Sequence, residues 1–173
     1  MKTVIMKRII TLVLLLLTLS SCNLFKNTLP EEMPDDFSFS IMWNTDGISS
    51  YDSKTGILIK DKYATNVAEY TTSYFLTEDE LKEIYKLIYD LNIDSCPDEF
   101  PYGTFVDADP SSRLSLSVST RDYNKTVKAN SVGAYESFTI KGSQYLEVIK
   151  GIRNILTETD AWKALPDYEF YRN

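Results

Sequence analysis

Polar and apolar residues alternate along two segments of the chain, which predicts two strands that each bury one face. In residues 37–43, aromatic and aliphatic side chains alternate with Ser38, Ser40 and Met42. In residues 114–119, leucine and valine alternate with serine. A period of two is typical of a half-buried strand. Shorter β-rich segments bounded by turn residues predict further strands at 48–51, 57–62, 69–75 and 126–129.

Residues 77–91 have the signals of an amphipathic helix. Thr77 is a natural N-cap, and Glu80 completes the pattern of a capping box. The acidic residues 78–80 suit the N-terminal end of a helix dipole, so they do not require a bound cation as their explanation. The expected buried face consists of Leu81, Ile84, Ile88 and Leu91.

A second helix is expected over residues 144–157, with Ser143 as its N-cap and Leu146, Ile149 and Ile152 facing the sheet. One-faced strands combined with two amphipathic helices predict an α+β fold, an antiparallel β-sheet with both helices packed on one face. The length is that of a single domain. We place this domain at residues 37–173.

The start of the chain has a different pattern. Basic residues precede an apolar run at 9–19, which is too short for the roughly 20 residues that span a bilayer. The following Leu19-Ser20-Ser21-Cys22 resembles the lipobox of bacterial lipoproteins. The resemblance implies a signal peptide at residues 1–21 and lipidation of Cys22. At least two acyl chains would then anchor the protein stably to a bacterial cell membrane, with the domain outside the cytoplasm. A plain secretory signal with a chance cysteine is the alternative.

The net charge of the chain limits the classes of partner that the protein can bind. Residues 1–21 contain three basic and no acidic residues, so their removal takes the formal charge of the chain from −7 to −10. This excess argues against a nucleic-acid partner and against electrostatic attachment to anionic headgroups. Residues 22–36 contain two prolines and four carboxylates without periodicity. They predict a flexible acidic spacer, which could extend to roughly 45–50 Å.

The chain has two cysteines and no histidine. Lipidation of Cys22 leaves Cys96 as the only thiol, which excludes an internal disulfide. The lack of histidine excludes Ser–His–Asp and Cys–His catalysis and every His-ligated metal site, and it leaves carboxylate-pair and Ser–Lys chemistry open. Cys96 is either a reactive or intermolecular thiol or a small, partly buried hydrophobe, and we favour the second interpretation.

The candidate site is the long loop at residues 92–112, which holds five carboxylates and no basic residue. Hard cations prefer several oxygen ligands on one segment. A calcium-loop pattern nevertheless fails, because Val118 stands where the bidentate Glu belongs. Two interpretations stay open, a weak cation or ligand-binding loop and a solvated acidic loop. The candidate residues are Asp98, Glu99, Asp107 and Asp109, and we assign no catalytic residue, no metal ion and no cofactor.

The polar faces of the two alternating strands are rich in serine. Ser38 and Ser40 lie in the first, and Ser115, Ser117 and Ser119 lie in the second. These hydroxyl groups suit a surface for sugars or a protein partner. The alternative, which we favour, is the ordinary hydrated face of a one-sided sheet.

Three segments resemble a group of uncharacterised bacterial envelope proteins. They are FLTEDEL at the start of the first helix, CPDEF at residues 96–100 and WKALP at residues 162–166. Residues 51–61 loosely match a hairpin of the same group. The resemblance implies a shared fold and an envelope location, and it implies no activity.

Two functions from different classes follow. The first is a membrane-anchored, non-catalytic binding or accessory module of the cell envelope that contacts a protein or a cell-wall glycan. The second is a hydrolase of envelope glycan built on a carboxylate pair from the acidic loop, which requires two facing carboxylates. The lack of a catalytic motif favours the binding module.

Overall fold

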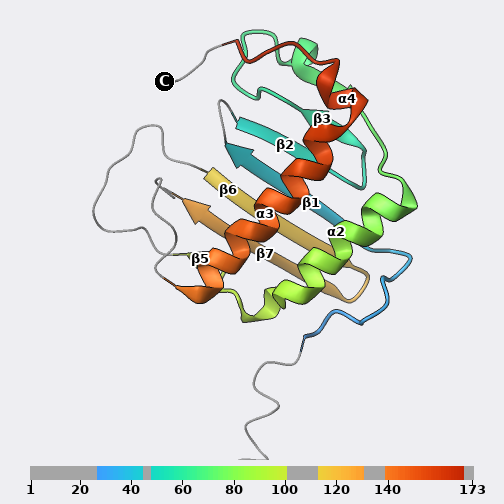
Figure 1. Cartoon of the computed structure of the whole chain (residues 1–173), viewed down its shortest axis with the longest axis vertical. Coiled ribbons are helices and arrows are strands. Elements are labelled where there is room, and N and C mark those ends of the chain that lie inside the picture. Colours follow the sequence, from blue (N-terminus) through green and yellow to red (C-terminus); the bar gives the residue numbers. More distant parts are fainter. Residues whose placement is uncertain (1–26, 45–47, 101–112, 131–138, 170–173) are drawn as a thin grey trace, which may run out of the picture.

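A computed structural model describes residues 27–44, 48–100, 113–130 and 139–169 of the chain. These residues form one seven-stranded sheet in the order β4-β3-β2-β1-β6-β7-β5, two long helices and three short helical segments (Figure 1). The strands are β1 (Ser38–Asn44), β2 (Ile48–Asp52), β3 (Ile57–Ile59), β4 (Thr71–Ser73), β5 (Glu99–Phe100), β6 (Arg113–Thr120) and β7 (Tyr123–Asn130). The helices are α2 (Glu78–Leu91), α3 (Ile140–Glu158) and α4 (Asp160–Lys163), with the 3-10 segments η2 (Val67–Tyr70) and η3 (Ile93–Ser95).

The sheet is antiparallel at every pairing but one. β1 is central and pairs with β2 on one side and β6 on the other, which places Ser40 opposite both Asp52 and Ser117. The short edge strand β5 runs parallel to β7, with Glu99 opposite Lys128. The expected antiparallel sheet is confirmed, with this two-residue parallel pairing added at its edge. β5 occupies the free edge of β7, because β6 pairs with the other edge of β7.

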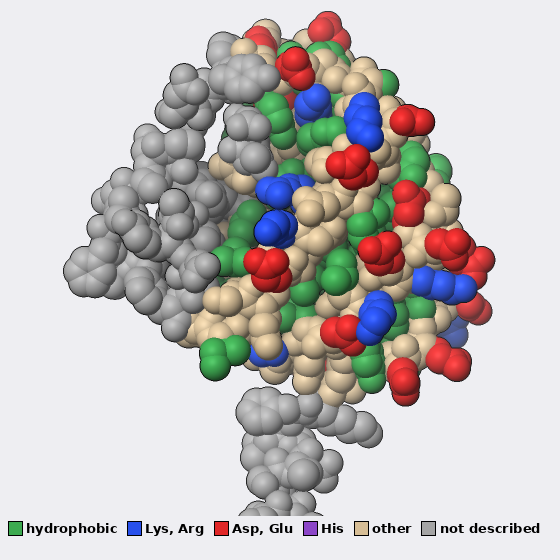
Figure 2. All heavy atoms as spheres, viewed as in Figure 1, with side chains coloured by type: hydrophobic (Ala, Val, Ile, Leu, Met, Phe, Trp, Pro, Cys, Tyr) green, Lys and Arg blue, Asp and Glu red, His purple; other side chains and the backbone are tan. Residues whose placement is uncertain are grey.

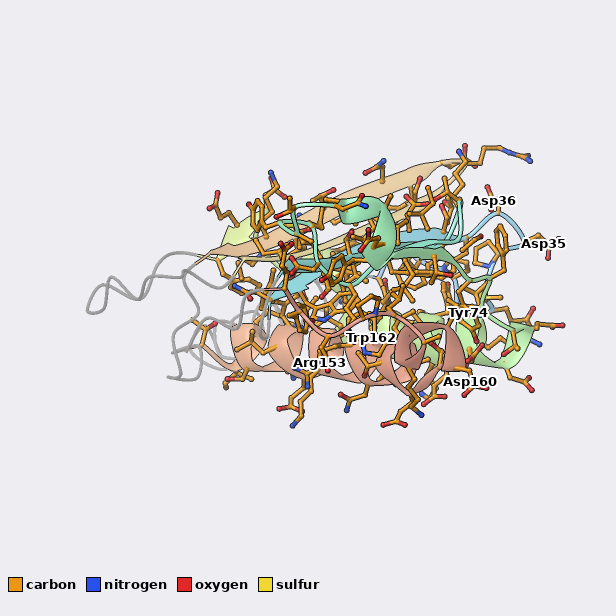
Figure 3. All side chains as sticks on the ribbon, turned by 90° about the horizontal axis from the view of Figure 1, so that it is seen from above. Asp35, Asp36, Tyr74, Arg153, Asp160 and Trp162 are labelled. Atoms are coloured by element: carbon orange, nitrogen blue, oxygen red, sulfur yellow. The ribbon has the colours of Figure 1, made fainter. Side chains whose placement is uncertain are left out.

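The predicted two-layer α+β architecture is confirmed, because α2 and α3 lie on the same face of the sheet (Figures 1 and 3). The apolar positions of β1 and β6 point into this interface, and Trp43, Leu116 and Val118 are almost completely buried. Burial of one such side chain contributes about 1.5–3 kcal/mol. Among the described residues no helix covers the opposite face of the sheet (Figure 3).

Helix α2 begins where the sequence predicts. The Thr77 hydroxyl accepts a hydrogen bond from the Glu80 amide, and the Glu80 carboxylate accepts one from the Thr77 amide, which completes the capping box. The helix ends at Asn92, whose left-handed φ of 50° asparagine tolerates better than most residues. Ile84, Tyr85, Ile88 and Leu91 form its buried face.

Helix α3 begins one turn earlier than expected. Thr139, and not Ser143, is its N-cap, because the Thr139 hydroxyl accepts a hydrogen bond from the Gly142 amide at 3.0 Å. The buried face is shifted accordingly, and Tyr145 and Val148 join Ile149 and Ile152 in the core. The strand expected at 69–75 is also shorter, because residues 67–70 form η2 and only Thr71–Ser73 pair with β3.

The domain begins earlier than residue 37. Residues 27–36, which the sequence places in the flexible spacer, lie along α2. The Asn27 side chain donates to the Tyr89 carbonyl at 2.9 Å, the Tyr85 hydroxyl donates to the Pro30 carbonyl, and Leu29 is buried in the core. The hydrophobic contact of Leu29 and these hydrogen bonds outweigh the local preference of a Pro- and acid-rich segment for open conformations.

No helix in the described part of the chain is long and apolar enough to cross a membrane.

The β2–β3 turn provides a test of this fold. Gly56 has a φ of +69°, and a Cβ atom there would lie 3.0 Å from ring atoms of Phe75. Because alanine is strained at this φ, we expect Gly56→Ala to lower the free energy of unfolding by at least about 1 kcal/mol, measured by urea denaturation.

Gly151→Ala is the matched control for this prediction. A Cβ at Gly151 in α3 meets only the flexible end of Leu87, at 2.9 Å, and alanine favours the helix by roughly 1 kcal/mol. We therefore expect Gly151→Ala to lower the free energy of unfolding by less than Gly56→Ala does. Equal losses in the free energy of unfolding of the two variants would contradict the claim that the positive φ of Gly56 disfavours alanine.

Candidate functional site

The acidic candidates from the sequence do not form a site among the described residues. Asp98 is exposed and forms an ion pair with Lys125, whose hydrogen bond holds the pKa of the Asp98 carboxyl below its usual value. Glu99 is an exposed residue of β5. Asp107 and Asp109 lie outside the described residues. Within the described part, no three Cys, Asp or Glu side chains lie close enough to share a metal ion.

Two further residues of this loop have structural roles. Asp94 accepts hydrogen bonds from the Tyr123 hydroxyl at 2.8 Å and from the Thr28 amide at 2.7 Å. Cys96 is a free, buried thiol of the core. Burial raises its pKa, against the opposing charges of Lys141 and Lys125, so the favoured interpretation of Cys96 as a small hydrophobe is confirmed. The proposed lipidation residue, Cys22, lies outside the described residues.

The serine positions lie together on the face of the sheet opposite the helices. Ser38 pairs with Ser119 across β1 and β6, and Ser40 pairs with Ser117. The Ser117 hydroxyl continues this row through a hydrogen bond of 2.9 Å with the Thr126 hydroxyl. These short side chains are half-buried. The face is therefore a hydroxyl-bearing surface without a described covering layer.

A buried serine and a buried lysine lie together under the C-terminal segment, which bears on the Ser–Lys chemistry left open above. The Ser49 hydroxyl donates to the Lys60 carbonyl at 2.6 Å and hydrogen-bonds the Tyr168 hydroxyl at 2.8 Å. The Lys60 ammonium donates to the Leu165 carbonyl at 3.3 Å and lies 5.4 Å from the centre of the Trp162 ring. These contacts hold residues 165–169 against the sheet. Because Ser49 is fully buried and its hydroxyl is already hydrogen-bonded, it is not placed to act as a nucleophile.

The described residues form a pocket of about 640 Å³ at the end of the sheet where β1 begins. Three segments meet there, namely the entry to β1, the end of β2 with its turn, and the end of β6. The link from β4 into α2 forms the remaining wall. Figure 3 shows Asp36 and Tyr74, from two of these segments, at the same end of the sheet. The volume of the pocket is in the range typical of small-molecule sites.

The lining of this pocket combines an apolar floor with polar groups at the ends of strands. The apolar residues are Phe37, Tyr51, Phe75, Leu76 and Leu81. The hydroxyl groups come from Ser38, Ser53, Ser119 and Thr120, and the charged groups from Asp36, Lys54 and Arg121. An apolar pocket with a few converging polar groups is the usual form of a binding site.

The pocket walls are held by hydrogen bonds from neighbouring segments. Asp36 accepts a hydrogen bond from the Arg121 amide at 2.6 Å, which joins the entry of β1 to the β6–β7 turn. The Tyr51 hydroxyl donates to the Tyr74 carbonyl at 3.0 Å, and the Tyr74 hydroxyl donates to the Glu80 carboxylate at 2.9 Å. The N-terminal end of α2 is thereby tied to the sheet on both sides of Phe75 and Leu76.

This arrangement is suited to binding. Asp36 is the one carboxylate among the described residues of the lining, and one of its oxygens is already engaged by the Arg121 amide. These lining residues include no cysteine, and with no histidine in the chain their hydroxyl groups have no imidazole base. Sequence reasoning missed this pocket, because its residues come from separate turns and links and no local motif joins them.

No protein-family model matches the chain, and no curated protein matches it in sequence.

The hydrogen bonds at Glu80 predict how stability changes in acid. Burial raises the pKa of Glu80, but hydrogen bonds from the Thr77 amide, the Thr77 hydroxyl and the Tyr74 hydroxyl outweigh it, so the net pKa lies below 4.5. A lowered pKa stabilises the fold at higher pH, and this stability is lost as the pH falls through the folded-state pKa. We expect Glu80→Gln to be less stable than the unmodified chain at pH 7, with the difference shrinking below pH 4.5.

Asp79→Asn is the control, since it removes an exposed carboxylate of the same turn. Urea denaturation at a series of pH values measures both variants. The difference in free energy of unfolding between Glu80→Gln and the unmodified chain could also stay constant down to strongly acidic pH. That result would contradict the claim that the capping hydrogen bonds stabilise the charged form of the Glu80 carboxylate.

Proposed function

We propose that the protein is a lipid-anchored, non-catalytic binding module of the bacterial cell envelope, and that the pocket at the start of β1 is its binding site. The observation that carries this proposal is the combination of an apolar floor with hydroxyl and cationic groups in one pocket of about 640 Å³. The lipobox-like Leu19-Ser20-Ser21-Cys22 supports the anchor. The net charge of −7 supports a partner other than nucleic acid.

The packing of residues 27–36 changes how an anchored domain would be held. Only five residue steps separate Cys22 from Asn27, the first described residue and one already bonded to α2. A chain of this length spans at most about 18 Å. Attachment at Cys22 would therefore keep the domain close to the membrane, rather than at the longer distance expected from a spacer that extends to residue 36.

The contacts of the acidic residues do not favour the alternative, a carboxylate-pair hydrolase. A general acid needs a raised pKa to hold its proton near neutral pH, whereas Lys125 lowers the pKa of Asp98. Asp94, another carboxylate of this loop, is engaged by the Tyr123 hydroxyl and the Thr28 amide. The binding module is therefore the function that we propose.

The anchor makes a direct prediction for cell fractionation. In the bacterium that produces the protein, the unmodified chain should sediment with membranes, and Cys22→Ala should move to the soluble or secreted fraction because no thiol remains to be acylated. Cys96→Ala is the control and should stay with the membranes, since Cys96 is a buried core residue. Retention of Cys22→Ala on membranes would contradict the lipid anchor.

The binding function is tested by photo-crosslinking in intact cells. We replace Thr120, which lines the pocket, with a photo-reactive amino acid, and we use Glu83 on the exposed side of α2 as the control position. We expect a covalent adduct from position 120 and none from position 83, and the adduct mass distinguishes a small molecule, a glycan and a protein.

Two outcomes contradict the binding function at the pocket. One is equal crosslinking from both positions, which indicates random collisions. The other is the absence of any adduct from position 120 in a chain that remains folded and anchored.

A further inference from the structure

Two cations face the pocket from turns on either side of β1. Lys54 lies in the β2–β3 turn and Arg121 in the β6–β7 turn, and both side chains are exposed. Because β1 lies between β2 and β6, the two turns leave the same end of the sheet two strand spacings apart, which is about 10 Å. A ligand in the pocket lies between them.

Lys54 and Arg121 differ from the other cations of this acidic chain in that both line the pocket. Neither has an ion pair with a described carboxylate, which is also true of Lys62, Lys128 and Lys141, whereas the remaining described lysines that form ion pairs lie elsewhere. Figure 2 shows acidic side chains gathered over α2 on the helix-bearing face. In a chain with a net charge of −7, two cations without carboxylate partners at one pocket favour an anionic ligand there.

A hydroxyl donor accompanies the two cations at this end of the pocket. The Ser53 hydroxyl accepts a hydrogen bond from the Phe39 amide at 2.8 Å, which leaves its own proton to donate. Asp36 is the one acidic residue that the structure describes in the lining, and one of its oxygens accepts the hydrogen bond from the Arg121 amide. The donors of Ser53, Lys54 and Arg121 suit a carboxylate, phosphate or sulfate group.

The rest of the pocket is apolar. Phe75 is 66% exposed although it is a large aromatic residue, and its ring is held against Gly56. Leu76 and Leu81 continue this surface and are partly exposed. A ligand that covers these side chains gains hydrophobic free energy in addition to the charge contacts.

We propose that the pocket binds a monomeric amphipathic anion, meaning an acyl or aryl body that carries one carboxylate, phosphate or sulfate group. The apolar body covers Phe75, Leu76 and Leu81, and the anionic group lies between Lys54 and Arg121. The volume of this open pocket, about 640 Å³, fits a single small molecule. This deepens the proposed function and rests on it only in taking the pocket as the binding site.

Three probes of equal chain length test the proposal: octanoate, octanol and octylammonium. They are titrated as monomers into the mature chain, residues 22–173 with Cys22→Ala, which contains every described residue of the domain. Backbone NMR shifts give both the site and the affinity. We expect octanoate to bind about five- to tenfold more tightly than octanol, and octylammonium to bind most weakly.

Charge variants identify the cations responsible. Lys54→Gln/Arg121→Gln should reduce the affinity for octanoate to that for octanol, because both residues lie in exposed turns and the fold does not depend on them. Lys62→Gln/Lys128→Gln removes the same charge from exposed positions outside the pocket lining and should leave octanoate binding unchanged. Equal loss in the two double variants would overturn the assignment to Lys54 and Arg121.

Apolar variants test the floor separately. Phe75→Ala should weaken octanoate and octanol alike, whereas Ile140→Ala removes another exposed apolar side chain, at the start of α3, and should have no effect. Loss of octanoate binding in both variants would overturn the role of Phe75.

The outcomes separate this inference from the proposed function. Equal affinity for octanoate and octanol in the unmodified chain would overturn the anionic preference, and the pocket would stand as a binding site. Absence of shifts in the pocket with all three probes would overturn the amphipathic ligand, whereas the crosslinking outcomes given above decide the binding function. Binding of anionic phospholipid vesicles without binding of octanoate would assign the cations to a membrane surface and overturn the monomeric ligand.

Discussion

The burial of one face of the sheet is the constraint on which the rest of the structure depends. β1 and β6 place Trp43, Leu116 and Val118 on one side and serine on the other, so only one side gains from a covering layer. Helices α2 and α3 supply that layer through Ile84, Ile88 and their counterparts in α3. The opposite face is left with hydroxyl groups that stay compatible with water.

The same constraint explains where the pocket lies. The helix layer covers the middle of the sheet, and the chain has to cross from β4 to α2 at the end where β1 begins. Phe75 and Leu76 lie on this crossing, and the turns after β2 and β6 surround it. The pocket is therefore bounded by turns and links, which carry exposed charges, and its apolar floor joins the exposed Phe75 to the buried core residues Phe37 and Tyr51. Such a boundary between core and turns provides the mixture of apolar and charged groups that an amphipathic ligand needs.

Much of the fold could be predicted from the sequence, because its signals are local. The capping box of Thr77 and Glu80 involves residues three positions apart, and the alternation in β1 and β6 is visible within each strand. The errors involve contacts between distant segments. Leu29 packs in the core although the composition of its neighbours predicts a spacer. The pocket depends on the pairing of β1 with β6, which lie about 80 residues apart in the chain. Of the four acidic candidates, Asp98 and Glu99 proved exposed, since an acidic composition alone does not determine which side chains converge.

The central claim is that ligand binding takes place in the pocket and not on the serine-bearing face of the sheet. The most direct test is to add fractionated cell-envelope extracts to the isotopically labelled mature chain and to map the NMR shifts by residue. The account predicts changes at Leu76, Leu81 and Thr120, which line the pocket, with Ser40, Ser117 and Thr126 unaffected. Shifts confined to the row of Ser40, Ser117 and Thr126 would contradict it and would assign binding to the open face of the sheet.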